Sequence, residues 1–213
     1  MNRPDVSFYL AHFTSGRQPV GNKDESNPAH EFSRTTPIKR LENILRMKTI
    51  LATTLPWTGK RAVCFTECPW TSLIDHTKRY SSFGIGFNKK FIFVSGGGPV
   101  YYVRADYFEH QKWSDYAMTF VSPFWPKYRS LKNDQDKDFP QCDYTHEREW
   151  RLPHDLKFEY SDIEFIIMNK YVDMAKFPQD LKDAVGRDKF LLMENYKKIE
   201  TLWPVHNLNL SSS

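Results

Sequence analysis

Short segments in which apolar and polar residues alternate recur along most of the chain, and their distribution limits the fold more than any other feature of the sequence. The segments are SFYLAHFT (7–14), AVCFTEC (62–68), FGIGF with KKFIFV (83–94), VYYVRADY (100–107), THEREWRL (145–152) and DIEFIIMN (162–169). A period of two predicts β-strands. In the first segment this period places Leu10, His12 and Thr14 on one face. Several short strands spread over the chain predict a sheet that is assembled from distant segments.

Helical segments lie between these strands. TPIKRLENILRMKTI (36–50) has a helical apolar stripe, with Thr36 as the N-cap and Pro37 at the first helical position. We expect further helices at 69–80, 108–122 and 175–199, and a hairpin turn at SGGGP (95–99). The predicted fold is α+β, with mostly antiparallel strands and inserted helices.

Length and composition indicate one domain over residues 1–213. Hydrophobic residues make up 40% of the 213 residues and charged residues 26%. No apolar run is long enough to span a membrane, and the N-terminus lacks a signal-like apolar core. We therefore expect a cytoplasmic protein with no membrane contact. The polar segment 15–35 is predicted to be a lid loop and 208–213 a disordered tail.

The three cysteines favour reduced thiols over a disulfide framework. A zinc site is one alternative, with Cys64, Cys68, Cys142 and His146 as its ligands. Residues four apart on a strand lie roughly 13 Å from each other, so Cys64 and Cys68 cannot share one ion while the strand continues. We therefore expect no metal.

Charge is concentrated in residues 78–132, which hold nine Lys and Arg, three Asp and Glu, and 15 of the 33 aromatic residues. Most of these aromatics are interpreted as core residues of strands. The segment 123–132 differs, because its two prolines argue against a regular element. Trp125 and Tyr128 could stack on bases there, and Lys127 and Arg129 could meet phosphates. This segment is the candidate nucleic-acid contact.

The segment THEREWRLP (145–153) carries the most unusual pattern. Read as a strand, it places Glu147, Glu149 and Arg151 on one face and Trp150 on the other. Such a face can be a solvated set of ion pairs of little energetic value. It can also be the ExExR core of a metal-dependent nuclease, although Arg cannot release a proton to activate water. In a third interpretation, a glutamate stabilises positive charge developing at a sugar carbon.

The third interpretation needs partners elsewhere, and several motifs occur in a suitable order. HFT (12–14) is followed by NILRMKTILA, by VCFTECPWTSL and, late in the chain, by EREW. In this order the sequence resembles ADP-ribosyltransferases. It is similar to the DarT-like and CmdT-like toxins that modify nucleic acid, and it also resembles AbiGi-type abortive-infection proteins. The resemblance implies a split antiparallel β core with NAD in the cleft.

The resemblance also implies roles for individual residues. His12 would hold a ribose hydroxyl of NAD, the backbone of Phe13 the nicotinamide amide, and Thr14 would support that strand end. Glu149 would be the catalytic glutamate, and Glu147 would orient the acceptor.

The sequence offers more than one candidate for each of the remaining NAD contacts. Phe65, Tyr80 and Phe83 are candidates to stack on the nicotinamide ring, and Arg34 or Arg61 could bind the pyrophosphate. We expect NAD as a substrate, no metal, a nucleic acid (RNA or single-stranded DNA) as acceptor and a neutralising antitoxin protein as partner. A toxin or phage-defence effector is the implied role. A metal-dependent nuclease and an inert, partner-binding member of an abortive-infection system remain alternatives.

Overall fold

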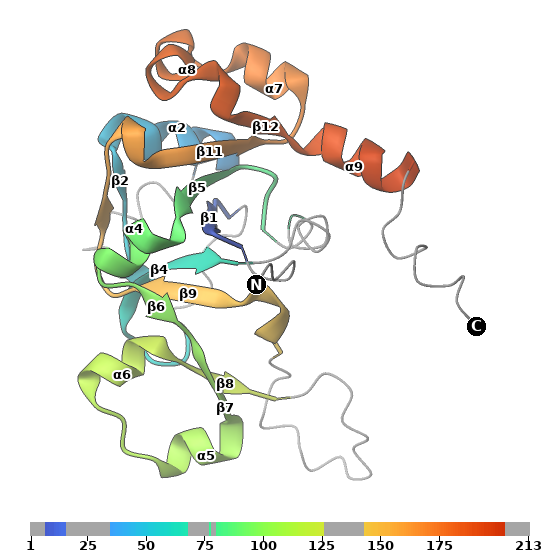
Figure 1. Cartoon of the computed structure of the whole chain (residues 1–213). Coiled ribbons are helices and arrows are strands. Elements are labelled where there is room, and N and C mark those ends of the chain that lie inside the picture. Colours follow the sequence, from blue (N-terminus) through green and yellow to red (C-terminus); the bar gives the residue numbers. More distant parts are fainter. Residues whose placement is uncertain (1–6, 16–34, 68–76, 78–79, 126–142, 203–213) are drawn as a thin grey trace.

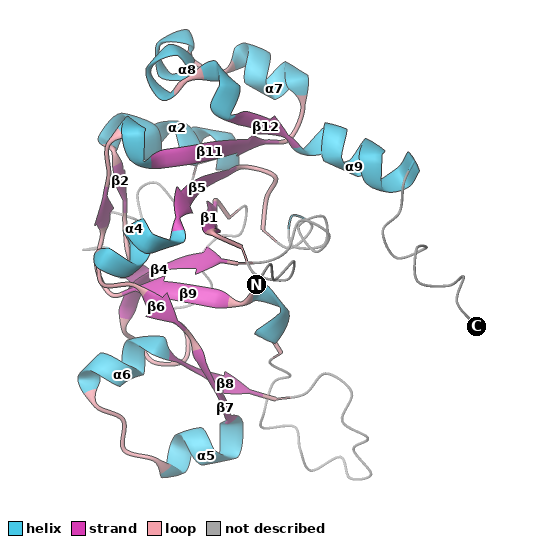
Figure 2. Ribbon diagram, viewed as in Figure 1, coloured by secondary structure: helices cyan, strands magenta, loops and turns pink. Residues whose placement is uncertain are grey.

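The computed structural model describes residues 7–15, 35–67, 77, 80–125 and 143–202, the last four by their backbone alone. Its strands and helices are interspersed along the chain (Figures 1 and 2). In chain order they are β1 (Tyr9–Phe13), α2 (Pro37–Met47), β2 (Thr49–Ile50), β3 (Thr53–Thr54), β4 (Arg61–Thr66), β5 (Gly84–Asn88), α4 (Lys89–Val94), β6 (Gly98–Pro99), β7 (Tyr101–Arg104), α5 (Ala105–His110), α6 (Asp115–Phe120), β8 (Val121–Phe124), η2 (Thr145–Glu147), β9 (Glu149–Leu152), β10 (Leu156–Lys157), η3 (Tyr160–Asp162), β11 (Ile163–Met168), α7 (Tyr171–Lys176), α8 (Gln179–Val185), η4 (Arg187–Lys189), β12 (Phe190–Leu192) and α9 (Met193–Leu202).

One sheet organises the described part of the chain. Its strand order is β12-β11-β5-β1-β4-β9-β6, with β3 paired to β4 beside this path. All of these pairs are antiparallel except β11 with β12. Two small two-stranded sheets, β10 with β2 and β7 with β8, lie outside it. The protein is therefore an α+β protein built on a mostly antiparallel sheet, as the strand-like segments predict.

Both faces of the sheet carry apolar clusters. On one face, Leu10 and Phe65 belong to the larger cluster, which α2 and α8 complete with residues such as Leu41. On the other face, Phe13 belongs to a smaller cluster with Met193 at the start of α9. The alternation predicted for the first strand is confirmed, because neighbouring residues of β1 enter different clusters.

Helix α2 confirms its sequence signals. The Thr36 hydroxyl accepts a hydrogen bond from the Lys39 amide, and Pro37 is the first helical residue. Leu41 and Leu45 are buried against the sheet. The helix ends at Met47; the following residue, Lys48, has a left-handed backbone (φ 46°), and the chain then enters β2. This helix lies directly beside the strands that form the site described below.

The prediction of a hairpin around SGGGP is wrong in two respects. KKFIFV is helix α4 rather than a strand, and the Asn88 side chain caps it by accepting from the Lys90 amide. A short apolar run does not distinguish a strand from a buried helix by its period. In addition, β7 pairs in parallel with β8, which α5 and α6 connect to it. Pro123 lies within β8, so its presence does not exclude a regular element there.

The segment THEREWRL is a strand in its second half only. Thr145–Glu147 forms a turn of 3₁₀ helix, Arg148 adopts a left-handed conformation (φ 45°, ψ 54°), and β9 begins at Glu149. The predicted strand over 145–152 is therefore too long. The left-handed Arg148 changes the direction of the chain between Glu147 and Glu149. A strand period of two, applied to the whole segment, cannot predict this change.

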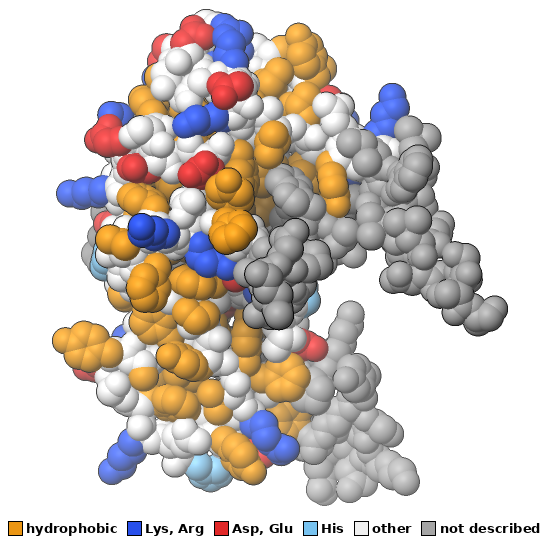
Figure 3. All heavy atoms as spheres, viewed as in Figure 1, with side chains coloured by type: hydrophobic (Ala, Val, Ile, Leu, Met, Phe, Trp, Pro, Cys, Tyr) orange, Lys and Arg blue, Asp and Glu red, His pale blue; other side chains and the backbone are white. Residues whose placement is uncertain are grey.

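Several predictions lie outside the described residues. These are most of the lid loop 15–35, nearly all of the helix 69–80, the greater part of the segment 123–132 and the tail 208–213. None of the helices within the described ranges has the length and apolar character that a membrane crossing requires. Figure 3 shows hydrophobic side chains gathered over α4, β6 and α6, where Phe93, Val94, Tyr101 and Tyr116 are exposed.

Candidate functional site

The sheet opens between β1 and β4. Strand β1 pairs with β5 over all five of its residues, whereas its described pairing with β4 is the contact of Ala11 with Thr66. Gly84 allows the close approach on the β5 side, because a Cβ there would lie 2.9 Å from the His12 carbonyl oxygen. Beyond Ala11, the backbone pairing of β1 with β4 stops. A side-chain contact follows instead, in which His12 Nδ1 lies 2.9 Å from the Cys64 carbonyl oxygen.

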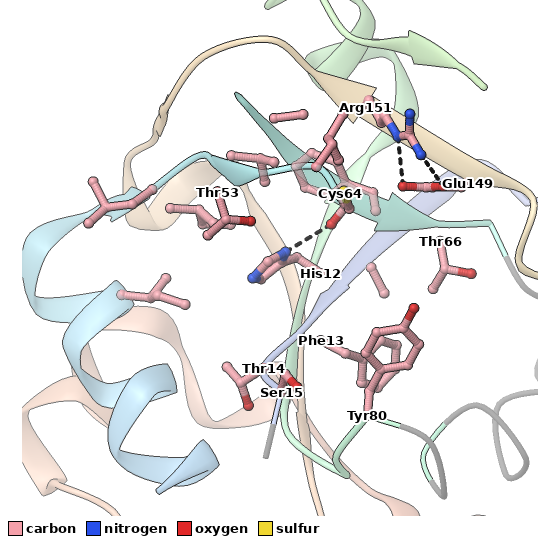
Figure 4. A pocket seen from close by; sticks show the side chains of 18 of the residues that line it. His12, Phe13, Thr14, Ser15, Thr53, Cys64, Thr66, Tyr80, Glu149 and Arg151 are labelled. Carbon is pink, nitrogen blue, oxygen red and sulfur yellow. Dashed lines mark hydrogen bonds and ion pairs between the residues drawn. The ribbon is translucent and has the colours of Figure 1, made fainter. Parts of the chain in front are cut away.

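The protonation of His12 follows from this contact. A carbonyl oxygen can only accept, so Nδ1 carries the hydrogen and donates it. Burial lowers the pKa of His12 below its usual value of 6.5, and the hydrogen bond to Cys64 opposes this effect without reversing it. The ring is therefore neutral near pH 7, and its Nε2 is an acceptor that points away from Cys64 (Figure 4).

A cavity of about 550 Å³ surrounds this opening. Helix α2 and strands β1 to β4 line one part of it, and β9 with the residues preceding it lines another (Figure 4). Polar and aromatic side chains on its wall include His12, Thr14, Arg40, Asn43, Trp57, Cys64, Tyr80, Glu147, Glu149 and Arg151. A volume of this size suits a small organic ligand.

Glu149 lies on this wall but on the opposite face of the sheet from His12. Residues paired in an antiparallel ladder share a face. Thr66 pairs with both Ala11 and Glu149, so these three residues share one face, and His12 lies on the other. The cavity reaches both faces because β1 and β4 separate beyond Ala11.

Glu149 and Arg151 form a bidentate ion pair. Arg151 Nε and a terminal nitrogen donate to the two carboxylate oxygens at 2.8 and 3.0 Å. The other terminal nitrogen donates to the carbonyl oxygens of Thr119 and Val121 at 3.0 and 2.9 Å. Both side chains are largely buried, with 6% and 13% of Arg151 and Glu149 exposed. The interaction with Glu149 raises the pKa of Arg151 although burial opposes it, so the guanidinium is permanently charged.

Glu147 is held differently. The Tyr80 hydroxyl lies 3.2 and 3.0 Å from its two carboxylate oxygens. The Thr66 hydroxyl donates to its backbone carbonyl. Glu147 is 5% exposed, and it lines the same cavity as Glu149.

The Cys64 thiol faces the acidic pair. Burial raises its pKa well above the usual value, and the charge of Glu149 adds to the effect. The thiol is therefore protonated near pH 7 and is a poor nucleophile. Among the described residues, no group of three His, Cys, Asp or Glu side chains could hold a metal ion. Cys68 and Cys142, the two other cysteines of the zinc alternative, lie outside the described residues.

The other candidates for NAD contacts divide into two groups. Phe65 and Tyr80 line the cavity, whereas Phe83 does not belong to its wall. Phe65 is only 2% exposed, which leaves Tyr80 with more of its ring accessible. Thr14 lies beside Phe83, since its hydroxyl is 3.2 Å from the Phe83 carbonyl oxygen.

Of the two predicted arginines, the structure describes only Arg61. Arg61 donates to the Ala52 carbonyl oxygen and lies 3.5 Å from an Asp155 oxygen, and it does not line the cavity. Arg34 lies outside the described residues. Trp125 follows β8 as a half-buried residue away from the cavity wall, and Lys127, Tyr128 and Arg129 lie outside the described residues.

Sequence reasoning missed Arg40. It lines the cavity from α2 and donates to the Ser15 carbonyl oxygen, and burial lowers its pKa. The sequence contained a signal for this position, namely the i, i+3, i+4, i+7 spacing of one helix face in Arg40, Asn43, Ile44 and Met47. All four residues line the cavity. This face adjoins the core stripe of the same helix.

The fold and site define an α+β protein whose antiparallel sheet opens onto a ligand-sized cavity with a neutral histidine and two glutamates. A family model described as "Putative abortive phage resistance protein AbiGi, antitoxin" matches residues 32–180. The match covers more than two thirds of the chain, and the protein belongs to this family. No curated protein and no solved structure matches the chain. The matched residues include Tyr80, Glu147 and Glu149, whereas His12 precedes them.

Proposed function

We propose that the protein is an NAD-dependent mono-ADP-ribosyltransferase that acts in abortive phage resistance. The observation that carries the proposal is the opening between β1 and β4, where the neutral His12 and a buried glutamate pair line one cavity. The family description supports the setting, since it names abortive phage resistance. The resemblance of HFT and EREW to ADP-ribosyltransferase motifs supports the chemistry, with an ADP-ribosyltransferase-like split sheet as the fold.

The cavity offers groups that would complement each end of NAD. Nε2 of His12 can accept a hydrogen bond from a ribose hydroxyl, and the Tyr80 ring can stack on nicotinamide. Arg40 supplies a cation for the diphosphate in place of the two arginines that the sequence suggested. The cationic nicotinamide ring would then lie toward the glutamates. A ligand with separated positive and negative parts suits a cavity with Arg40 on one wall and Glu147 on another.

The reaction breaks the bond between the ribose C1′ and the nicotinamide nitrogen. The bonding electrons leave with nicotinamide, and positive charge develops on the sugar. A carboxylate in the cavity stabilises that charge without moving, because it is already held in place. An acceptor nucleophile then bonds to C1′ and loses its proton. Nucleic acid is the proposed acceptor, on the basis of the basic and aromatic segment 123–132.

The test is nicotinamide release by the purified protein with NAD, supplied in turn with single-stranded DNA, RNA and cell protein. We expect NAD-dependent labelling of nucleic acid. His12→Ala should weaken NAD binding measured by calorimetry, because it removes the acceptor at the opening. His110→Ala, an exposed histidine on α5, is the matched control and should bind as the wild type does. Equal binding by both variants would contradict the placement of NAD beside His12.

An antitoxin that binds a partner protein without catalysis is the second candidate. Two observations favour it: the family description contains the word antitoxin, and Arg151 neutralises Glu149 within the cavity. In that case the wild type should release no nicotinamide with any acceptor. Its expression should instead protect cells from a co-expressed toxin. Protection without NAD turnover would replace the first proposal by this one.

A further inference from the structure

One part of the cavity wall contains none of the groups that the proposed function assigns to NAD. It is apolar, and it is formed by Ile44 and Met47 of α2, by Leu51 and by Trp57. Ile44 and Leu51 are half-buried, whereas Met47 and Trp57 are 44% and 40% exposed. Large apolar side chains that lie exposed on the wall of one cavity are typical of a ligand contact.

Strand β4 separates Trp57 from the acidic part of the cavity. The turn that carries Trp57 leads from β3 into the first residue of β4, whereas Glu149 pairs with the last residue of β4. The strand between these two places rises roughly 17 Å. His12 contacts β4 between them, through the Cys64 carbonyl oxygen. In Figure 4, Thr53 and helix α2 accordingly lie on one side of His12 and Glu149 on the other.

The turn fixes the backbone around Trp57 without engaging its indole N–H. The Leu55 amide donates to the Lys60 carbonyl oxygen at 2.7 Å, which closes the turn. The indole N–H groups of Trp113 and Trp150 have acceptors at 3.1 and 3.2 Å, whereas within the described residues that of Trp57 has none. Trp57 is therefore a positioned and partly exposed ring on the cavity wall, as a stacking surface for a ligand requires.

We infer that Trp57 is the stacking surface for the adenine ring of NAD, and that Met47 contacts the same ring. The placement rests on the proposed function, which sets nicotinamide beside Tyr80, its ribose at His12 and the diphosphate at Arg40. NAD carries its two rings at opposite ends of a chain of two riboses and a diphosphate. The adenine ring therefore lies on the far side of His12 from the nicotinamide.

Helix α2 leads from the diphosphate to this site. Met47 follows Arg40 by two turns on the same helix face, about 10 Å along the axis. An aromatic side chain stacks on a nucleobase, and a methionine thioether packs well against an aromatic ring. Both side chains thus suit a flat purine ring better than a charged or strongly hydrated group.

Two nucleotides separate the ends of the ligand, and calorimetry measures the binding of each to the purified protein. AMP has the adenine ring without nicotinamide, and nicotinamide mononucleotide has the reverse. Trp57→Ala should weaken the binding of AMP and of NAD about tenfold through the loss of stacking. It should leave the binding of nicotinamide mononucleotide unchanged. Trp57→Phe keeps an aromatic ring and should recover most of the affinity for AMP.

Two further variants complete the experiment. Met47→Ala should weaken AMP binding less than Trp57→Ala does, because it removes a flexible side chain and no ring. Tyr116→Ala on α6 is the matched control, since Tyr116 is 91% exposed and does not line the cavity, and it should bind AMP as the wild type does. All four variants should melt near the wild-type temperature, because the side chains that they shorten are exposed.

The outcomes distinguish the adenine site from the transferase. AMP binding that is absent in the wild type, or that survives Trp57→Ala, would overturn the inference. The proposed function would stand if nicotinamide mononucleotide still bound in a manner that His12→Ala weakens. Weaker binding of single-stranded DNA to Trp57→Ala, with AMP unaffected, would assign the ring to the acceptor and also overturn the inference. AMP binding that requires Trp57, in a protein that releases no nicotinamide from NAD, would support the adenine site and overturn the transferase.

Discussion

His12 Nδ1 donates a hydrogen bond to the carbonyl oxygen of Cys64 at the point where β1 separates from β4. The imidazole thus occupies a position that a backbone amide would hold in a continuous ladder. Because the pKa of the half-buried His12 ring is lowered in the folded protein, the contact makes the stability of the fold depend on pH.

The first prediction is the direction of that dependence. The pKa of His12 is lowered from 6.5 in the folded protein, so the unfolded chain takes up the proton first as pH falls. The contribution of His12 is therefore complete above about pH 6.5 and is lost as pH falls below that value. His12→Gln, which does not titrate, should lose less free energy of unfolding than the wild type between about pH 7.5 and pH 5. Urea unfolding at the two pH values measures this, and equal losses would contradict it.

The second prediction concerns Glu67, which is 9% exposed on β4's C-terminal side. Its oxygens accept from the Ser7 amide and the Trp150 indole and lie 2.6 Å from Lys89 Nζ. Glu67→Ala leaves these donors without their acceptor and should lower the free energy of unfolding by about 1–3 kcal/mol. We expect this loss of unfolding free energy to be smaller than for a fully buried ion pair, because the Lys89 side chain is 22% exposed. A matched control is Glu42→Ala on α2, whose ion pairs involve the more exposed Lys39 and Arg46.

The third prediction concerns Gly86 in β5. A Cβ at this position would lie 2.3 Å from atoms of the Phe165 ring on the neighbouring strand β11. Gly86→Ala should therefore destabilise the protein by about 1–3 kcal/mol, as measured by chemical denaturation. The cost should shrink in a Phe165→Leu background, since the ring is the obstacle.

Gly59→Ala is the control for this experiment. No atom lies within 4 Å of a Cβ at Gly59, but its φ of +67° is unfavourable for alanine. Its cost comes from the backbone and should be the same with or without Phe165→Leu. If both glycine variants respond equally to Phe165→Leu, the steric explanation for Gly86 is incorrect.

The fourth prediction separates transferase from nuclease. A transferase of the proposed kind should keep its activity in EDTA and should require NAD. A nuclease built on Glu147 and Glu149 would need a divalent ion held by carboxylates. Cleavage of DNA or RNA that EDTA abolishes and that NAD does not influence would establish the nuclease in place of the transferase.

The fifth prediction concerns the segment 123–132 and is made from the sequence. Replacing Lys127 and Arg129 with Ala should weaken nucleic-acid binding, and each lost phosphate contact should reduce the slope of log affinity against log salt by about one. NAD hydrolysis without acceptor should be little changed, because the cavity residues are untouched. Unaltered affinity and salt slope in the double variant would mean that this segment does not receive the acceptor.

Local patterns were sufficient for much of the fold. The period of two placed β1, β4, β9 and β11, and the cap at Thr36 with the following proline placed the start of α2. These features are determined by neighbouring residues, so they can be read from a short window. KKFIFV was misassigned because its two aromatic positions fit a strand as well as a helix, and the distinction depends on which side chains meet the core. In α4, Phe91 and Ile92 pack against the core while Phe93 is exposed.

The sequence by itself determined that Glu147, Glu149 and Arg151 stand close together, since they are covalent near-neighbours. Only the tertiary structure decided their relationships. Arg151 pairs with Glu149 because carbonyls from α6 and β8, some thirty residues away, fix its guanidinium. Glu147 meets Tyr80, and Arg40 lines the same cavity, because separate elements fold onto one opening in the sheet. Side-chain partners of this kind depend on long-range packing, and no period in a single sequence encodes them.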